Sequence, residues 1–369
     1  MPTCAEDPTV KLVKAIIQAG PRNFSQLARL TGIPAETVRY KIKSQLVAKG
    51  IYIHAITDTS KLGLQRFMAH LTFTDNYRSV AKALLQSLHE LSYLTYYSAE
   101  LMTKRHYCLF QVPIEFKNEF TEFLDAMIDY KILESYSLWP IAWINHISLK
   151  PEYFDFQRER WDIDWQHLSP PADIPEITPE EIKDVEFDKS DLLLIKELTV
   201  NSMSTIADIS KKIGSNVKTL QYHYLSHVLG RNMIKNYTVR WMGDIESTRM
   251  HRIVFMRLYM ERLTRSEMDL MRRVIYGLPF TWSEIISDNR QLFVSEVCIP
   301  VDQIMDYKYY MHKNLGDLSS KLEERVLDVF ESGAFTLPYN LYDPTFRKWT
   351  FDIKRNVSGL QNFQMAYKQ

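Results

Sequence analysis

The first fifty residues place apolar side chains at the spacing of short helices. Residues 10–20 (VKLVKAIIQAG) have apolar side chains at positions 12, 13, 16 and 17, which form the stripe of one helix face. Residues 24–32 (FSQLARLTG) predict a second helix that ends at Gly32, and residues 34–50 (PAETVRYKIKSQLVAKG) predict a third that ends at Gly50. Two short helices joined by a glycine turn, beside a supporting helix, indicate a helix-turn-helix.

The pattern then alternates between strands and helices. The predicted elements are, in order, strand 66–73, helix 77–91, strands 92–101 and 106–112, helix 115–130 and strand 132–147. This β-α-β-β-α-β order is that of a ferredoxin-like sandwich.

The whole pattern recurs about 180 residues later. Arg39-Tyr40 aligns with Gln221-Tyr222 at an offset of 182, and Arg66 aligns with Arg252 at an offset of 186. The predicted fold class is therefore α+β, with two copies of a winged helix-turn-helix, each followed by a ferredoxin-like βαββαβ domain. The predicted segments are helix-turn-helix 1–60, sandwich 61–150, an acidic proline-containing linker 151–187, helix-turn-helix 188–245, sandwich 246–343 and a basic tail 344–369.

Charge is distributed unevenly, although the formal net charge is zero. Residues 21–53 hold six bases and one acid, as do residues 204–240, whereas residues 152–188 hold twelve acids and three bases. Two basic islands can bind a polyanion even when the total charge cancels. The three cysteines form no CxxC pair and the N-terminus has no apolar signal core, so we expect a cytoplasmic protein with no membrane partner.

The basic islands contain the third helix of each helix-turn-helix, which is the helix that enters the major groove of DNA. Arg39 suits a guanine edge, whereas Gln221 at the matching position suits adenine, so the two helices should prefer different bases. The predicted partner is double-stranded DNA. The residues expected to face it are Thr37, Arg39, Tyr40, Lys41 and Lys43 in the first copy, and Lys218, Thr219, Gln221, Tyr222 and His223 in the second.

FSQLARLTGIPAETVRYKIKSQLVAKGI, with the β-α-β-β-α-β unit after it, resembles the Lrp/AsnC family of transcription regulators in a tandem, archaeal-type version. The resemblance covers about 9–150 well and 188–335 more loosely. It implies a DNA-binding regulator rather than an enzyme, with ACT-like (RAM) sandwiches that form a homodimer or larger oligomer. The family also binds amino-acid effectors beside a glycine-containing turn, but the corresponding turns here, SAELMTKRHY and IISDNRQLF, contain no glycine.

Two further sets of residues leave alternatives open. His223 and His227 have the i, i+4 spacing of metal ligands, but no cysteine or glutamate nearby in the sequence completes a site, so no metal is expected. His106 beside Arg105 suggests the siroheme decarboxylases, which resemble this architecture and use histidines and basic side chains around a tetrapyrrole. A ligand-binding scaffold is a third alternative. No glycine-rich phosphate loop or GxSxG motif is present, and no catalytic residue or cofactor is predicted.

Overall fold

The computed structural model describes residues 6–183, 185–241 and 252–367, and the predicted boundary at 245/246 lies outside them. The first helical unit consists of α1 (Pro8–Ala19), α2 (Phe24–Thr31), α3 (Ala35–Tyr40) and the π-helical continuation η1 (Lys41–Leu46). The Asp7 carboxylate caps α1 by accepting from the Thr9 amide at 2.6 Å. Gly32 ends α2 at φ 71°, a left-handed conformation that glycine adopts without strain.

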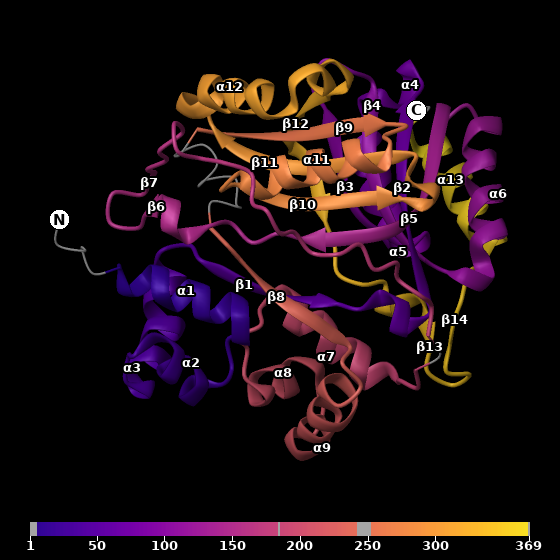
Figure 1. Cartoon of the computed structure of the whole chain (residues 1–369). Coiled ribbons are helices and arrows are strands. Elements are labelled where there is room, and N and C mark those ends of the chain that lie inside the picture. The colour runs from indigo at the N-terminus through magenta and orange to yellow at the C-terminus, as the bar shows by residue number, and fades with distance from the viewer. Residues whose placement is uncertain (1–5, 184, 242–251, 368–369) are drawn as a thin grey trace.

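The second helical unit repeats this order. It consists of α7 (Lys189–Val200), α8 (Ile206–Ile213), α9 (Val217–Tyr222) and the π-helical η5 (His223–Leu229). Asp188, Thr205 and Asn216 cap its three α-helices through their side chains. Both units lie on one side of the molecule, below the strands in Figure 1.

Eight of the described strands form two four-stranded sheets, each with two covering helices. The first sheet has the order β3-β4-β2-β5 and the second β10-β11-β9-β12, which is the ferredoxin-like order in both. Their elements are β2 (Leu64–Phe73), α5 (Ala81–Leu91), β3 (Leu94–Glu100), β4 (Arg105–Pro113), α6 (Lys117–Asp129) and β5 (Leu133–His146), then β9 (Ile253–Glu261), α11 (Arg265–Gly277), β10 (Thr281–Ser287), β11 (Leu292–Pro300), α12 (Ile304–Leu315) and β12 (Glu323–Ala334). The α+β fold class, with helix-turn-helix units and ferredoxin-like domains, is confirmed.

The two sheets close into one eight-stranded barrel, which the sequence pattern does not predict. Closure runs through β5 and β10, with Ile144 opposite Ile285, and through β3 and β12, with Ala99 opposite Asp328. Because both edges of each sheet are paired within the chain, a homodimer would have to form through surfaces other than these edges.

A two-stranded ribbon lies between the barrel and the helical units (Figure 1). It pairs β1 (Tyr52–Thr57) antiparallel to β8 (Ile234–Arg240), one strand from each helical unit. Each hydrophobic core combines residues from both halves of the sequence. The first helical unit shares a core with the second sheet, and the second helical unit shares one with the first sheet. The two halves of the sequence are therefore not two separate bodies.

The segments that follow each sheet also contain short helices and hairpins. η4 (Pro151–Tyr153) and the hairpin β6 (Phe154–Asp155)–β7 (Arg160–Trp161) match η9 (Tyr339–Leu341) with β13 (Tyr342–Asp343)–β14 (Lys348–Trp349) near the other end of the chain. The last helix is α13 (Ile353–Tyr367), and the remaining short helices are η2 (Thr59–Leu62), α4 (Asp75–Arg78), η3 (Ile114–Phe116), η6 (Asp288–Arg290), η7 (Val301–Gln303) and η8 (Gly316–Lys321).

The acidic linker is held against the fold by ion pairs. The Glu180 carboxylate lies 2.9 Å from the Arg66 guanidinium and also accepts from Lys235. Among the described residues, no helix combines the length and apolar composition that crossing a membrane requires.

Candidate functional site

The structure places eight of the ten predicted DNA-facing residues on exposed surface of α3, η1 and α9. Lys41 is half-buried, and its ammonium donates to Gln45 at 3.0 Å. His223 is buried, and its Nδ1 lies 2.9 Å from the Asp191 carboxylate, so its predicted exposure is wrong. The first turn of η5 directs this side chain toward α7 instead of outward. The exposed residues are Thr37, Arg39, Tyr40, Lys43, Lys218, Thr219, Gln221 and Tyr222.

A large cavity lies where the barrel opens toward the β1–β8 ribbon, and we call it the ribbon-side cavity. Its volume is about 1110 Å³, and residues of all eight barrel strands and both ribbon strands line it. None of the ten predicted residues is among the lining residues. Small-molecule sites commonly measure about 300–1,000 Å³, so this volume suits a large ligand rather than a free amino acid.

Buried polar atoms without a hydrogen-bond partner gather in this cavity. Such atoms are uncommon in folded proteins and cost free energy unless water or a ligand satisfies them. Six lining residues carry one within the described part of the chain, and they are Thr59, Gln111, His146, Thr238, Arg240 and Trp282. The cavity is therefore suited to a ligand with several polar groups.

Arg240 supplies a half-buried positive charge. Its guanidinium carbon lies 4.3 Å from the centroid of the Trp282 ring, and its Nε has no partner. Burial lowers the pKa of this guanidinium, opposed by the nearby Glu296, although arginine stays protonated in proteins. No carboxylate of the described residues forms an ion pair with it, whereas Arg66 in the same cavity is already paired with Glu180. Among the described residues that line the cavity, Arg240 is thus a cation without a carboxylate partner, which suits an anionic ligand.

Two histidines in the cavity are neutral near pH 7. Burial lowers the pKa of His146 to about 3, helped by the positive charges of Arg240 and Arg66. Burial also lowers the pKa of His54, whose Nδ1 lies 3.0 Å from the Thr199 carbonyl oxygen. Because a carbonyl only accepts, Nδ1 of His54 carries the hydrogen and Nε2 keeps its lone pair. This is the state in which a histidine can ligate a metal.

The far end of the barrel interior holds a smaller cavity of about 200 Å³, lined in part by His70, Glu100 and Tyr259. The Tyr259 hydroxyl donates to the Glu100 carboxylate at 2.6 Å. Between the two cavities, the Arg257 guanidinium lies over the Tyr107 ring at 3.4 Å and pairs with Glu296 at 3.0 Å.

His106, the histidine that the sequence connects with a tetrapyrrole, lines neither cavity. Its ring packs edge-on against Phe73 at 5.0 Å between centroids, and its Nδ1 has no partner. His106 therefore occupies a packing position, and the tetrapyrrole alternative has to rest on other residues.

The buried histidines predict that the protein is less stable in acid. Burial lowers the pKa of His70 to about 3 and of His106 to about 4, from the ordinary 6.5, as it does for His146. The unfolded chain binds more protons than the folded chain below pH 6.5, so stability is lost as the pH falls from 6.5 toward 4. At about 1.4 kcal/mol per unit of lowered pKa, the loss should reach several kcal/mol. Denaturant unfolding at pH 7, 6, 5 and 4 measures it.

Two variants separate this effect from general acid denaturation. His106→Gln should flatten the pH dependence, whereas His167→Gln, whose side chain is 82% exposed, should leave it unchanged. An equal slope in both variants would contradict the assignment.

The sequence offers few signals for the ribbon-side cavity. His146 belongs to the predicted strand 132–147, whereas His54 and Arg240 lie in strands β1 and β8, which the sequence pattern does not predict. Only the closure of the barrel by β5 and β10 brings His146 beside Arg240. The alternation of Ile144 and His146 along the predicted strand 132–147 places this histidine on the same face as an apolar residue.

Comparisons with known proteins connect the fold with a decarboxylase. No family model matches the chain, and no curated protein matches it in sequence. The crystal structure of the siroheme decarboxylase NirDL is similar over 96% of this chain and 100% of its own, at a TM-score of 0.56 and 13% identity. The same enzyme in complex with an iron-uroporphyrin III analogue gives the same coverage and TM-score at 12% identity.

The similarity to regulators is shorter. A regulatory protein of the AsnC family from Pyrococcus furiosus covers 37% of this chain and 89% of its own, at a TM-score of 0.29 and 13% identity. Sequence identities of 12–13% indicate similarity of fold alone, and no conclusion is drawn from the TM-score of 0.29. The full-length similarity to an enzyme nevertheless overturns the expectation that this chain is not an enzyme.

Proposed function

We propose that this protein is an enzyme of the siroheme decarboxylase kind, which binds an iron tetrapyrrole in the ribbon-side cavity and removes a carboxyl group from it. The observation that carries the proposal is the half-buried Arg240, which lines a cavity of about 1110 Å³ and has a buried Nε without a hydrogen-bond partner. A tetrapyrrole with carboxylate side chains is large, flat and anionic, and it matches the cavity in size and charge. A free amino acid, the effector implied by the resemblance to regulators, fills only a small part of this volume.

The charged and apolar residues of the cavity have different roles in the proposed reaction. Arg240 binds a carboxylate that stays on the macrocycle, because a strong ion pair to the reacting carboxylate would stabilise the substrate more than the transition state. The apolar side chains of Phe255, Ile285 and Leu327 line part of the same cavity and disfavour a charged carboxylate. A reacting carboxylate placed there is destabilised relative to neutral carbon dioxide.

The reaction needs one proton and no oxidant. The bond between the side-chain carbon and its carboxylate breaks, carbon dioxide leaves, and the electron pair stays on the carbon until a proton arrives. We assign this proton to His146, which lines the cavity and has a buried Nδ1 without a hydrogen-bond partner. Anionic substrate offsets the positive charges that lower the pKa of His146, so binding makes it easier to protonate.

The proposal is tested by binding and by product analysis. We expect the purified chain to shift the absorbance spectrum of siroheme or iron-uroporphyrin III on titration, and to release carbon dioxide with a matching loss of mass from the porphyrin. Binding without loss of mass would contradict the enzymatic part of the proposal. The absence of any spectral shift would contradict all of it.

DNA binding is a second candidate, favoured by the exposure of Arg39 and its neighbours. The Arg39 side chain is 52% exposed, and its only ion pair in the described residues is with Glu36 at 3.9 Å on the same helix. α3 and α9 both lie at the edge of the molecule away from the barrel (Figure 1). We propose that these helices contact double-stranded DNA and that the two halves are copies of one ancestral unit.

The double variant Arg39→Ala, Lys41→Ala should weaken binding to duplex DNA. Arg39 is expected at a base edge and Lys41 at a phosphate, and each lost phosphate contact lowers the dependence of log K on log salt by about 1, so the slope should fall by about 1. Fluorescence anisotropy over a range of salt concentrations measures it. Lys117→Ala with Lys313→Ala removes two exposed charges from the barrel helices and serves as the control. Equal affinity and slope in both double variants would exclude this surface.

A further inference from the structure

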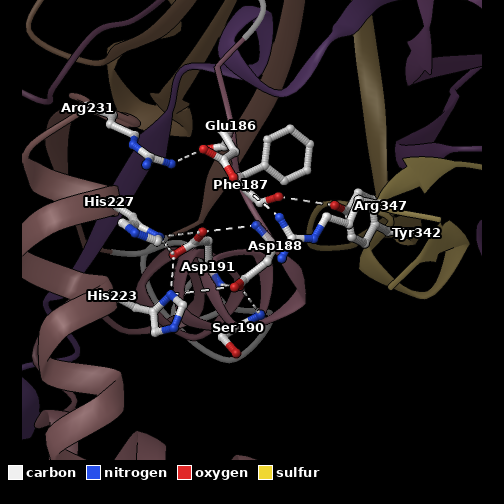
Figure 2. A network of polar contacts seen from close by, with 10 residues as sticks. All are labelled: Glu186, Phe187, Asp188, Ser190, Asp191, His223, His227, Arg231, Tyr342 and Arg347. Atoms are coloured by element: carbon white, nitrogen blue, oxygen red, sulfur yellow. Dashed lines mark hydrogen bonds and ion pairs between the residues drawn. The ribbon is translucent and has the colours of Figure 1, made fainter. Parts of the chain in front are cut away.

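Three possible metal ligands meet inside the second helical unit (Figure 2). Asp191 is the third residue of α7, and His223 and His227 are the first and fifth residues of η5. The Asp191 side chain is fully buried and also accepts from the Asp188 amide at 3.0 Å, which completes the capping box of α7. The capping box therefore holds the carboxylate in place before any ion binds.

The distances between the ligand atoms suit one ion. Nδ1 of His223 lies 2.9 Å from Asp191 Oδ1, and Nδ1 of His227 lies 3.0 Å from Asp191 Oδ2. A tetrahedral zinc ion with bonds of about 2.0–2.1 Å separates its ligands by about 3.3 Å. The ligand atoms of all three residues already lie within 4.8 Å of one another, so small side-chain rotations close the remaining distance.

The buried carboxylate needs a positive partner. No lysine or arginine of the described residues forms an ion pair with Asp191. The nearby Arg231 donates to the Glu186 carbonyl, and Arg347 pairs with the Glu186 carboxylate at 3.3 Å (Figure 2). An unpaired buried carboxylate is costly, so the charge has to come from a protonated imidazole or from a cation.

The first helical unit does without this cluster. Its matching positions are Val10, the third residue of α1, and Lys41 and Gln45, the first and fifth residues of η1. Val10 is buried, and Lys41 donates to Gln45 at 3.0 Å without reaching α1. The helical fold therefore requires neither a carboxylate nor two imidazoles at these positions, and their joint presence in the second unit needs another cause.

We propose that Asp191, His223 and His227 bind a divalent transition-metal ion, with zinc as the ion of first choice. Two imidazole nitrogens and one carboxylate oxygen are ligands that such ions prefer, and they leave at least one position for water. Asp188 stands on the open side, with its Oδ1 3.7 Å from Nδ1 of His223, and is half-exposed, so solvent reaches the site there. The ion joins α7 to η5 and thereby fixes the orientation of α9 and its exposed residues.

The test uses the full-length chain after metal has been stripped with a chelator. We expect one equivalent of Zn²⁺ to compete with a chromophoric chelator for the site, and the unfolding midpoint to rise by several degrees. Co²⁺ in the same site should give the visible absorption of a four- or five-coordinate ion.

A double variant, His223→Asn with His227→Asn, keeps amide donors for Asp191 and removes both imidazoles. It should lose the zinc stoichiometry, the cobalt spectrum and the zinc-dependent rise in the midpoint, while staying folded by circular dichroism. Lys41→Asn with Gln45→Asn, the matched control in the first unit, should retain all three.

Two results would overturn the proposal. One is a folded wild-type chain that takes up no stoichiometric Zn²⁺ or Co²⁺. The other is uptake that persists in the double histidine variant, which would move the ion elsewhere, for example to His54 and His146. Neither result depends on tetrapyrrole binding, so the site and the proposed enzymatic function can fail separately.

Discussion

Replacing Arg240 with glutamine should weaken the binding of iron-uroporphyrin III by about tenfold to a hundredfold. A hydrogen bond to a charged group contributes about 1.5–3 kcal/mol, and this guanidinium forms no ion pair with a carboxylate of the described residues, since the nearby Glu296 pairs with Arg257. Glutamine keeps a donor and much of the volume over Trp282 but removes the charge. Absorbance titration of wild type and variant at one salt concentration measures the ratio of dissociation constants.

Arg39→Gln is the matched control, because it removes an exposed arginine that lies outside the cavity. It should leave porphyrin affinity unchanged and reduce affinity for duplex DNA. Arg240→Gln should reduce porphyrin affinity and leave affinity for duplex DNA unchanged. Equal porphyrin affinity in Arg240→Gln and wild type would remove Arg240 from the site.

Of the substitutions described for their effect on the free energy of unfolding, Glu284→Ala should cause the largest loss. The Glu284 carboxylate is fully buried and accepts from Arg272 at 2.9 Å, from the Tyr276 hydroxyl at 2.6 Å and from the Trp143 indole at 3.1 Å. Arg272 also donates to the Pro175 carbonyl in the linker at 2.6 Å. Glu284→Ala leaves Arg272 buried without its partner, which typically costs roughly 3–5 kcal/mol in the free energy of unfolding.

Denaturant unfolding at pH 7 measures this loss, and two variants separate its cause. Glu331→Ala removes one partner of an exposed pair with Lys82 at 3.7 Å and should change stability by less than about 0.5 kcal/mol. Glu284→Leu combined with Arg272→Met removes both buried charges and should cost less than Glu284→Ala alone. A double variant that is less stable than the single one would contradict the account of an uncompensated charge.

Hydrophobic periodicity predicts the helical units and the order of the sandwich elements, because both depend on contacts that are local in sequence. Val38, Ile42 and Leu46, four residues apart, are buried on one side of the third helix, as helical periodicity requires. The same reasoning fails at His223, where the helical period alone leaves open whether a histidine faces solvent or Asp191, 32 residues earlier. Tertiary contacts decide that orientation.

The ribbon-side cavity could not be predicted for a related reason. Most of its residues come from ten strands, and its existence depends on which sheet edges pair. Sequence patterns specify which face of a strand is buried but do not specify the partner of an edge. The zero net charge of the chain likewise gives no sign that Arg240 lines this cavity without an ion pair to a carboxylate of the described residues. The site therefore follows from barrel closure rather than from a motif.

The shared hydrophobic cores have a consequence for synthesis on the ribosome. The first helical unit is synthesised early, and its own contribution to the shared core ends at Ile53. The sheet that completes this core begins at Ile253, which is 200 residues later in the chain. At about 5–20 residues per second, roughly 10–40 s pass before the first of those partners is made. During this interval Leu12, Ile16 and Ile53 lack the full cover that they have in the finished fold. We expect the nascent chain to depend on chaperones more than a protein of this length whose halves fold independently.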